Sequence, residues 1–374
     1  MQELPNVIWL CSWYPNEEDP YRGDFIQRQA MALSSKVRLS VFHIVFGSAE
    51  KVTRKVVHET LTENIWYLKE TNRLNRWLRI RRAGRAFLQA YQREFGQPDR
   101  VHLHIPLEMG LIALDWHQSG IPYFLSEHYG IYHPGIADHW KTRSFFFRYF
   151  LKRILAQSMN VVTVSRSLGE DMKNEGLIAD FRVIPNVVNT DLFYPSDRMA
   201  MHEFTFVHVS GMDENKNVKG ILEAAKHLKD EGFHFHLKLI GAADERLRSL
   251  IGSHHLQGMV SLVPPIPYAE VAEQIKAGHA GILFSWRETQ SCVVLEWLCS
   301  GMPVITSRAG GVEELVTQEN GILVNPGDVE ALVTALRDML ENYQRFNAEA
   351  ISRDAAGKYN YQVVASQFME LYSL

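Results

Sequence analysis

Short apolar runs alternate with stretches of helical periodicity along nearly the whole chain, and this alternation limits the possible folds more than any other feature. The runs have the length of buried strands of a parallel sheet. In the first half they are Val7–Leu10, Val37–Val45, Ile65–Leu68, Val101–His104, Tyr123–Ser126, Val161–Val164 and Arg182–Ile184. In the second half they are Phe204–Val209, Phe235–Ile240, Val260–Val263, Gly281–Phe284, Val304–Thr306 and Ile322–Val324. Strands separated by helices predict βαβ units, so we expect a parallel α/β sheet in each half.

The two halves are separated by a segment without periodicity. Residues 185–197 are rich in turn-forming Pro, Asn, Asp and Ser, so we place an interdomain hinge there. A chain of 374 residues is long enough for two domains, which typically have about 150 residues each. We therefore expect an N-terminal domain over residues 1–193, a C-terminal domain over residues 194–357 and a final helix over residues 358–374.

The composition argues against several classes of protein. A net charge of −4 predicts no general affinity for nucleic acid. The three cysteines lack metal or redox spacing and are odd in number, which argues against a disulfide framework and fits a reducing cytoplasm. The run Val7–Cys11 follows Pro5 without a basic leader, so we interpret it as a first buried strand and not as a signal peptide. No apolar run approaches the length of about 18 residues that predicts a transmembrane helix.

Two carboxylates follow one of the predicted strands. The apolar run Ala280–Phe284 is followed by a polar segment that contains Glu288. Glu296 lies further on, within the predicted helix Val293–Leu298. Open α/β sheets bind ligands just outside the carboxyl ends of their strands. A carboxylate at that edge can accept hydrogen bonds from two hydroxyl groups. We therefore expect both carboxylates at a ligand site, although each could also be an ordinary solvated charge.

A pair of glycines follows the next predicted strand. Gly310-Gly311 lets the backbone approach a ligand closely, and we expect a helix to begin at Val312. The amino end of a helix binds anions. The segment thus combines acceptors for hydroxyl groups with an anion-binding terminus, and a sugar carried on a diphosphate needs both.

This ordered string resembles the donor site of the retaining GT-B glycosyltransferases of family 4, which have two glutamates with seven residues between them, a turn with Gly and Pro, and a Gly-Gly pair before a helix. Glu288, Glu296, Gly301, Pro303 and Gly310-Gly311 supply these elements in order. The resemblance implies two doubly wound Rossmann-like domains facing across a cleft. It also implies that the first domain binds the acceptor, that the second binds the nucleotide sugar, and that the last helix crosses back to the first domain.

The resemblance assigns roles in the second domain. Glu288 would bind hydroxyls of the transferred sugar, Glu296 the ribose hydroxyls, and Lys216 the diphosphate. Gly211 stands where the family has an arginine, so main-chain amides or another basic side chain such as Arg287 would have to replace it. Main-chain amides of residues 289–293 would contact sugar and phosphate, although Gln290 and Ser291 replace the family's usual aromatic-glycine pair.

In the first domain, His128 follows a predicted strand and matches the family's histidine beside the donor sugar. Gly23 lies where the family's glycine loop meets donor and acceptor. His102 and His104 share one face of a predicted strand. We expect them to be structural or to lie on the acceptor side. The alternative is a metal site, for which the sequence suggests no third ligand. The implied catalytic set is Glu288, Lys216 and His128, and the implied donor-binding set is Gly23, Gly211, Thr289, Gln290, Ser291, Cys292, Val293 and Glu296. We expect no essential metal and no cofactor besides the nucleoside-diphosphate sugar as co-substrate.

The predicted function is therefore metal-independent transfer, with retention, of a hexose-type sugar from a nucleoside-diphosphate sugar to a glycan or lipid-linked acceptor in surface polysaccharide synthesis. The alternatives are a sugar-nucleotide epimerase or hydrolase on the same fold and a catalytically silent sugar-nucleotide-binding protein. Six arginines in Arg73–Arg85 and the aromatic-basic stretch Phe145–Leu155 predict either solvated helices or peripheral contact with an anionic membrane. We expect the protein in the cytoplasm, free or at the inner face of the membrane.

Overall fold

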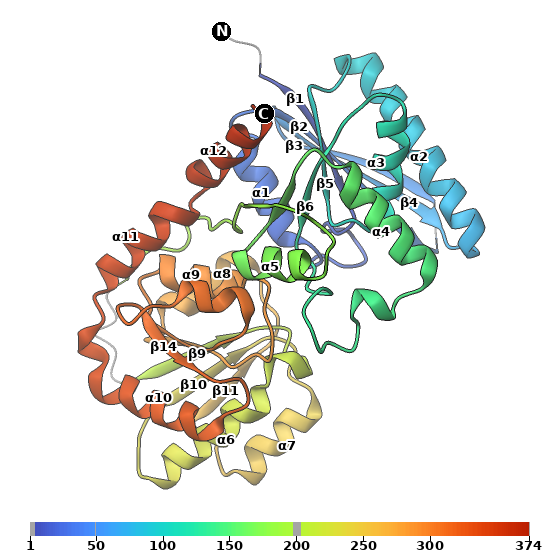
Figure 1. Cartoon of the computed structure of the whole chain (residues 1–374). Coiled ribbons are helices and arrows are strands. Elements are labelled where there is room, and N and C mark those ends of the chain that lie inside the picture. The colour runs from blue at the N-terminus through green and yellow to red at the C-terminus, as the bar shows by residue number, and fades with distance from the viewer. Residues whose placement is uncertain (1–3, 49, 197–202, 374) are drawn as a thin grey trace. The chain divides into compact units, whose positions relative to one another are not determined.

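A computed structural model describes residues 4–48, 50–196 and 203–373 (Figure 1). The chain divides into two compact units, an N-terminal unit of residues 1–187 with 361–374 and a C-terminal unit of residues 188–360. The N-terminal unit thus gives way to the C-terminal unit after Val187, whereas the sequence placed this boundary between residues 193 and 194. Each unit is an α/β structure built on one mainly parallel sheet, as the alternating pattern predicted.

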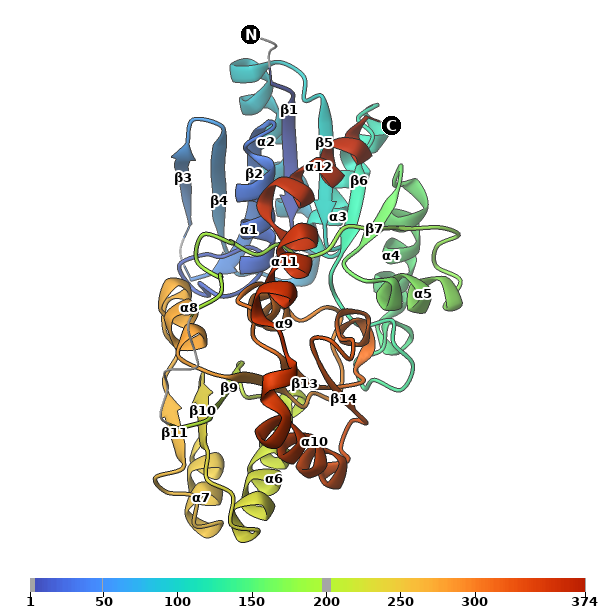
Figure 2. The ribbon, with the colours of Figure 1, turned by 90° about the vertical axis from the view of Figure 1, so that its left-hand side faces the viewer.

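The sheet of the N-terminal unit has the strand order β3-β4-β2-β1-β5-β6-β7-β8 within the described residues (Figure 2). Neighbouring strands are parallel except for β3, which pairs antiparallel with β4. The strand order reverses between β1 and β5, and such a reversal is the place where doubly wound sheets bind ligands. The strands are β1 Asn6–Cys11, β2 Arg38–Gly47, β3 Lys51–His58, β4 Leu61–Lys69, β5 Arg100–His104, β6 Phe124–Glu127, β7 Val161–Thr163 and β8 Arg182–Val183.

Both faces of this sheet are covered, because alternate residues of a strand point to opposite faces. On β1, Ile8 and Leu10 belong to one buried cluster, and Val7, Trp9 and Cys11 belong to another. Helices α2, α3, α4 and α5 contribute to the first cluster, and α1 and α12 contribute to the second (Figure 1). The helices are α1 Asp24–Leu33, α2 Arg73–Phe95, α3 Glu108–Gln118, η1 Trp140–Thr142, α4 Phe145–Gln157, α5 Arg166–Asn174 and α12 Tyr361–Tyr372.

The last helix of the chain packs on the N-terminal unit, as the resemblance implied. The tail forms two helices, α11 (Ala348–Tyr359) in the C-terminal unit and α12 in the N-terminal unit, with Asn360 between them. The Trp9 indole donates a hydrogen bond to the Tyr372 hydroxyl (2.9 Å), and Arg100 Nε donates to the Tyr372 carbonyl (2.8 Å). These contacts join the last helix to strands β1 and β5.

The sheet of the C-terminal unit has the order β11-β10-β9-β12-β13-β14, and every pair is parallel. Numbered from its own first strand, this is the order 3-2-1-4-5-6 of a Rossmann fold, with its ligand-binding crevice expected beside β9 and β12. The strands are β9 Thr205–Val209, β10 His236–Ile240, β11 Val260–Val263, β12 Ala280–Leu283, β13 Val304–Ser307 and β14 Gly321–Val324.

The core of this unit is one hydrophobic cluster between the sheet and its helices. Gly281 of β12 allows close packing of α9, because a Cβ added there would lie 2.3 Å from the Trp297 ring of that helix. The indole therefore lies directly against the backbone of the strand. The helices are η2 Glu214–Lys216, α6 Val218–Asp230, α7 Glu245–Ser253, α8 Tyr268–Lys276, α9 Cys292–Cys299, η3 Gly310–Leu315, α10 Val329–Asn342, η4 Tyr343–Arg345 and α11.

The structure contains every strand predicted from the sequence, but strand β3 and the segment from Gly310 differ from the prediction. Strand β3 was missed because it is a largely exposed edge strand with little apolar alternation, and charged edge strands resist unwanted pairing. The helix expected to begin at Val312 is wrong: residues Gly310–Leu315 form the short 3₁₀-helix η3. Within the described ranges, no helix is both long and apolar enough to cross a membrane.

Candidate functional site

Two loops meet at the carboxyl ends of β9 and β12, where the strand order of the C-terminal sheet reverses. Asn215, in the loop after β9, donates from Nδ2 to the carbonyl of Arg287 (2.8 Å). The amide of Trp286, in the loop after β12, donates to the carbonyl of Asn215 (2.8 Å). These two bonds hold together two segments that are distant in the chain, since Asn215 and Arg287 are separated by 72 positions.

Lys216 and Glu288 form an ion pair at this junction. Lys216 Nζ lies 2.6 Å from Glu288 Oε1, and the two side chains are 22% and 10% exposed. The ammonium group has three donors and the carboxylate has four lone-pair positions, so each retains hydrogen-bonding capacity beyond this contact. Two of the predicted catalytic side chains are therefore in direct contact in the structure.

Helix α9 begins at Cys292, four residues after Glu288. Its N-cap residue is Ser291, whose side chain makes no capping hydrogen bond. The first amides of any helix lack partners within the helix, and here they belong to the segment from Cys292. Gln290 and Ser291 are buried, whereas Thr289, Cys292 and Val293 are partly buried. The predicted donor-binding segment is thus one continuous loop and helix start beside Glu288.

Glu296 lies within α9, and its side chain is buried (5% exposed). It is four residues beyond Cys292, so the two residues share one face of the helix. Burying a carboxylate is costly unless hydrogen bonds or charges compensate it. A carboxylate at this position can accept hydrogen bonds from hydroxyl groups of a ligand.

One amide of the Gly310-Gly311 pair is bonded to the backbone of Glu288. The amide of Gly311 donates to the main-chain carbonyl of Glu288 (3.2 Å), so this donor is already engaged within the protein. Because η3 is a short 3₁₀-helix, it also lacks the amino terminus of an α-helix that was expected to bind an anion. The hydrogen bond from Gly311 supports the backbone of Glu288. The amino end of α9 is therefore the α-helix terminus that remains at this site.

Gly211, which stands where the family has an arginine, lies in an exposed and open part of the loop after β9. A Cβ added there would have its nearest neighbour, Asp213 Oδ2, at 4.0 Å. Its φ does not lie in the left-handed region that favours glycine, unlike that of the next residue, Met212 (φ 56°). Neither space nor backbone conformation therefore excludes a long side chain at this position.

We expect the Gly211→Arg variant to bind a nucleoside diphosphate about tenfold more tightly, because a guanidinium group forms charge-assisted, bidentate bonds to phosphate. Isothermal titration calorimetry would measure the change. Gly211→Ala is the control, since it adds a Cβ without a charge. Equal affinities in the arginine and alanine variants would contradict the placement of the diphosphate beside this loop.

The N-terminal unit brings together three histidines at the ends of β5 and β6. His104 Nδ1 and His128 Nε2 lie 3.3 Å apart, and the rings of His102 and His104 are stacked with centroids 4.6 Å apart. His102 also contacts the Tyr372 hydroxyl (2.9 Å) and the Ser126 hydroxyl (2.8 Å). These bonds give His102 a structural role. His104 Nε2 and His128 Nδ1 have no hydrogen-bond partner among the residues that the structure describes.

Burial keeps these imidazoles neutral. It lowers the pKa of His128 to about 3 and that of His102 to about 3, and it lowers the pKa of His104 well below the usual value. The neighbouring Glu127 carboxyl accepts hydrogen bonds from the amides of His128 (2.7 Å) and Tyr129 (2.8 Å), and burial raises its pKa to about 7. A neutral His128 can bind a hydroxyl group without bringing a charge to it.

The loop after β1 supports Gly23, whose backbone is left-handed (φ 73°). A Cβ added at Gly23 would lie 2.7 Å from the backbone carbon of Trp13 and 2.9 Å from the amide nitrogen of Tyr14. Across the strand reversal, Ser12 donates from Oγ to the carbonyl of Ile105 (2.7 Å), which has φ 66°. A β-branched residue with positive φ is strained, and strain of this kind gathers at functional sites. The sequence offered no signal for this residue.

We expect Gly23→Ala to lower the free energy of unfolding of the N-terminal unit by about 1–3 kcal/mol, because the new Cβ meets main-chain atoms and the backbone is left-handed. Urea unfolding followed by tryptophan fluorescence would measure this. Gly120→Ala is a matched control, since Gly120 also has positive φ (87°) but no atom within 4 Å of an added Cβ. Equal losses in both variants would mean that contact with residues 13 and 14 adds nothing.

The buried histidines predict that acid weakens the N-terminal unit more than the C-terminal unit. Their pKa values are lowered from about 6.5 in the unfolded chain, so the unfolded state binds more protons and stability falls as pH falls below about 6.5. Glu127 opposes this trend between about pH 4.5 and 7, because its raised pKa favours the folded state on the acid side. The histidines whose pKa burial lowers are His43, His102, His104 and His128 in the N-terminal unit, and His208 and the less deeply buried His236 in the C-terminal unit.

Pulse proteolysis in urea at pH 7 and pH 5, with fragments assigned to each unit, would measure this difference. Each histidine contributes at most about 1.4 kcal/mol per pH unit. His104→Gln should reduce the pH dependence of the N-terminal unit and leave that of the C-terminal unit unchanged. A uniform loss of stability in both units would show that these imidazoles do not dominate the acid response.

The arginines of α2 are largely engaged in ion pairs. Arg76 pairs with Glu70 (3.1 Å) and Glu108 (3.0 Å). Arg79 pairs with Glu50, and Arg81 and Arg85 both pair with Asp115. Most of the positive charge that suggested a basic membrane-binding face is therefore balanced by nearby carboxylates.

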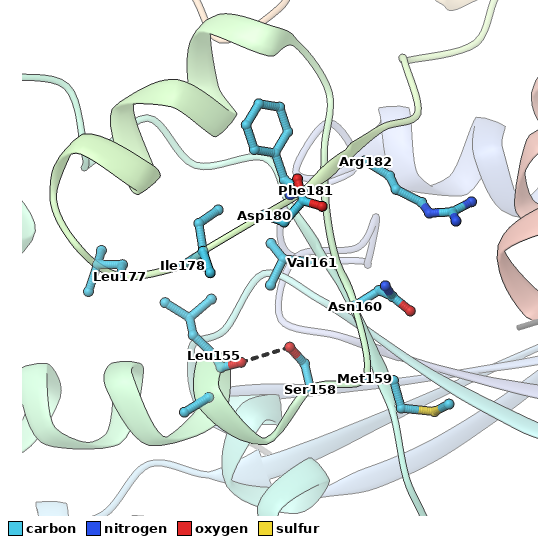
Figure 3. A pocket seen from close by; sticks show the side chains of 12 residues that line it. Leu155, Ser158, Met159, Asn160, Val161, Leu177, Ile178, Asp180, Phe181 and Arg182 are labelled. Atoms are coloured by element: carbon cyan, nitrogen blue, oxygen red, sulfur yellow. Dashed lines mark hydrogen bonds between the residues drawn. The ribbon is translucent and has the colours of Figure 1, made fainter.

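A cavity of about 410 Å³ lies at the edge of the N-terminal sheet (Figure 3). Met159 and Asn160, which precede β7, and Asp180 and Phe181, which precede β8, line it, so it lies at the amino ends of these strands. Part of its polar lining is engaged internally, since Ser158 Oγ donates to the carbonyl of Leu155 (2.8 Å; Figure 3). Ligands of doubly wound sheets bind at the opposite, carboxyl ends. This cavity is therefore not our candidate site.

Comparisons with known proteins agree with this architecture. Sulfoquinovosyl transferase SQD2 of Arabidopsis thaliana is 26% identical to 74% of this chain, in a match that spans 57% of the Arabidopsis protein. The putative teichuronic acid biosynthesis glycosyltransferase TuaC of Bacillus subtilis is 23% identical, over 97% of this chain and 94% of its own length.

The crystal structure of Anabaena HepE in complex with UDP has the same fold, with a TM-score of 0.78 at 18% identity over 99% of this chain and 100% of that one. Residues 28–192 match the family Glycosyltransferase Family 4, and residues 196–363 match Glycosyl transferases group 1. These two matches cover most of both units. The chain therefore belongs to the family 4 type of GT-B glycosyltransferases.

Proposed function

We propose that this protein transfers a hexose-type sugar from a nucleoside-diphosphate sugar to a glycan or lipid-linked acceptor, with retention of the anomeric configuration and without a metal ion. The observation that carries the proposal is the contact of Lys216 with Glu288 at the strand reversal of the C-terminal sheet. Lys216 supplies a positive charge, and Glu288 can accept hydrogen bonds from hydroxyl groups, next to the first amides of α9. This combination suits a ligand that joins a sugar to a diphosphate. In this proposal the C-terminal unit binds the donor and the N-terminal unit binds the acceptor.

The roles of individual groups are those that the resemblance to the family implies, and the chemistry of each group suits its role. Glu288 accepts hydrogen bonds from hydroxyls of the transferred sugar, and Glu296 accepts them from both ribose hydroxyls. Lys216 and the amides at the start of α9 bind the diphosphate. His128 remains a predicted contact of the donor sugar, and its neutral ring can form a hydrogen bond with a hydroxyl group.

The same groups would lower the barrier to transfer. As the bond between the sugar and the diphosphate breaks, negative charge grows on the departing oxygen. Lys216 and oriented amides stabilise that charge more than they stabilise the intact donor, which accelerates the reaction. The departing phosphate then accepts the proton of the attacking hydroxyl on the same face of the sugar. No dedicated base is needed in this scheme, and the configuration is retained.

Incubation with a panel of nucleoside-diphosphate sugars tests the proposal. UDP-glucose is the first donor to include, because HepE, which shares the fold, is seen with UDP. We expect release of nucleoside diphosphate and a new glycosidic product whose anomeric configuration, measured by nuclear magnetic resonance, equals that of the donor. Activity should persist in the chelator EDTA.

The other possible outcomes separate the alternatives. A free sugar without a glycosidic product would indicate a hydrolase, and a changed sugar still joined to the nucleotide would indicate an epimerase. Binding of donor without any turnover, across a broad set of acceptors, would indicate a silent binding protein. An inverted product would contradict the retaining mechanism while leaving the donor site intact.

A further inference from the structure

A cavity of about 830 Å³ lies between α2, α3 and α4 in the N-terminal unit. Sites for small-molecule ligands have volumes of about 300–1,000 Å³ and mainly apolar walls. Aromatic and aliphatic side chains form most of the wall of this cavity. Six of them are Leu74, Trp77, Leu111, Phe146, Phe147 and Phe150.

Charge in the lining of this cavity is strongly one-sided. Four arginines (Arg22, Arg73, Arg76 and Arg143) line it together with one carboxylate, Glu108. Arg76 and Arg143 have acidic partners. In the part of the chain that the structure describes, Arg22 and Arg73 form no ion pair: Arg22 lies over the Trp13 ring (5.7 Å), and Arg73 donates to the Ser144 hydroxyl (3.1 Å). An anionic ligand would find two guanidinium groups without a carboxylate partner.

Large apolar side chains beside this cavity are exposed. Leu74 is 70% exposed, Phe145 68% and Phe146 63%, and Tyr149 extends the same surface along α4. Exposed apolar groups gathered in one place mark a surface that contacts an apolar partner. Here they adjoin arginines, so the partner that fits has a hydrocarbon part and an anionic part.

The cavity also reaches residues that adjoin Gly23 and His128. Trp13 and Tyr129 line it, with ring centroids 4.9 Å apart. Tyr129 directly follows His128, and the backbone of Trp13 lies against Gly23. A molecule in this cavity would therefore lie next to the loop and the histidine that are predicted to meet the donor.

We propose that this cavity binds the acceptor as an amphiphile, with its hydrocarbon chain between α2 and α4 and its phosphate on Arg22 and Arg73. Guanidinium groups bind phosphate through paired charge-assisted hydrogen bonds, which explains arginine at these positions. The identification of this ligand as the acceptor rests on the proposed function. Binding of a long-chain phosphate does not.

Calorimetric titration of the intact chain with three probes tests the proposal. The probes are dodecyl phosphate, dodecyl maltoside and inorganic phosphate, each below its micellar concentration where one exists. We expect saturable 1:1 binding of dodecyl phosphate, with dodecyl maltoside and inorganic phosphate each weaker by about tenfold or more because each lacks one of the two parts. Equal binding of dodecyl maltoside and dodecyl phosphate would overturn the role of the arginines.

Two variants and one control locate the binding. Arg22→Glu with Arg73→Glu should weaken dodecyl phosphate by about tenfold to a hundredfold and leave dodecyl maltoside unchanged. Arg82→Glu, on an exposed residue of α2 outside the cavity lining, should change neither. Leu111→Trp should weaken both amphiphiles by filling the cavity. The proposal would be overturned if Arg82→Glu lost as much dodecyl phosphate binding as the double variant does. It would also be overturned if Leu111→Trp, with an unchanged circular dichroism spectrum, bound both amphiphiles as the unmodified protein does.

Thermal-shift titration of the same samples with UDP, GDP and ADP separates this proposal from the proposed function. Stabilisation by a nucleotide without binding of dodecyl phosphate would refute the amphiphile site alone. Binding of dodecyl phosphate without stabilisation by any nucleotide, and without turnover of any sugar donor, would support the site and refute the transferase. Each result therefore decides one of the two statements.

Discussion

Lys216→Ala should lower the turnover number of sugar transfer by about 10²–10³-fold, which is the cost of removing one group that stabilises charge in a transition state. Lys216 Nζ lies 2.6 Å from Glu288 Oε1, so the substitution removes the cation and also leaves Glu288 without its ion pair. Lys216→Arg keeps the charge and should recover part of the rate. Steady-state kinetics with saturating donor would measure the effect.

A nearby lysine provides the control for this prediction. Lys219 is exposed on the first turn of α6, and Lys219→Ala should keep the turnover of the unmodified protein. Because Lys216 and Glu288 are in contact, the double variant Lys216→Ala with Glu288→Gln should lose less than the product of the two single losses. Turnover of Lys216→Ala equal to that of Lys219→Ala would end the role of this lysine.

Glu296→Gln should raise the dissociation constant of the bound nucleoside diphosphate by about a hundredfold, the loss of two charge-assisted hydrogen bonds from ribose hydroxyls. The carboxylate is 5% exposed within α9, where the glutamine side chain has nearly the same volume. An amide is neutral and has one acceptor oxygen, and its NH2 group can only donate to the second hydroxyl, so both charge-assisted bonds are lost. Calorimetry with the nucleotide that the donor panel selects would measure the change.

The ribose itself supplies a sharper readout for Glu296. The unmodified protein should prefer the ribonucleotide over its 2′-deoxy form by about tenfold, and Glu296→Gln should abolish that preference. Glu319→Gln, on an exposed residue of the same unit, should retain it. If Glu296→Gln prefers the ribonucleotide over its 2′-deoxy form to the same extent as the unmodified protein, the carboxylate does not bind the ribose.

The C-terminal unit shows how far the sequence leads at a site. The alternation of strands and helices predicted the parallel sheet, and the string from Glu288 to Gly311 identified residues that gather beside its strand reversal. Local pattern failed where a long-range contact decides. Gly310-Gly311 resembles the start of an α-helix, but the amide of Gly311 bonds to the carbonyl of Glu288 and the segment forms a 3₁₀-helix.

The N-terminal unit shows the opposite limit. The arginine-rich stretch of α2 and the aromatic stretch of α4 were each visible in the sequence, but as separate helices with solvent or a membrane as partner. The structure pairs most of the arginines of α2 with carboxylates and places both helices around one cavity. Ion pairs between distant segments have no local pattern, so the surplus of charge at Arg22 and Arg73 could not be foreseen.

The sequence by itself determined the fold class, the order of the strands along the chain and the identity of the family, because strand and helix periodicities and an ordered motif are local properties of a chain. Only the tertiary structure decided which side chains touch. The pair of Lys216 with Glu288, the stacked histidines beside His128 and the arginine-lined cavity each join residues from different elements. Their contacts depend on the packing of helices against sheets, which the spacing of residues along a single element does not encode.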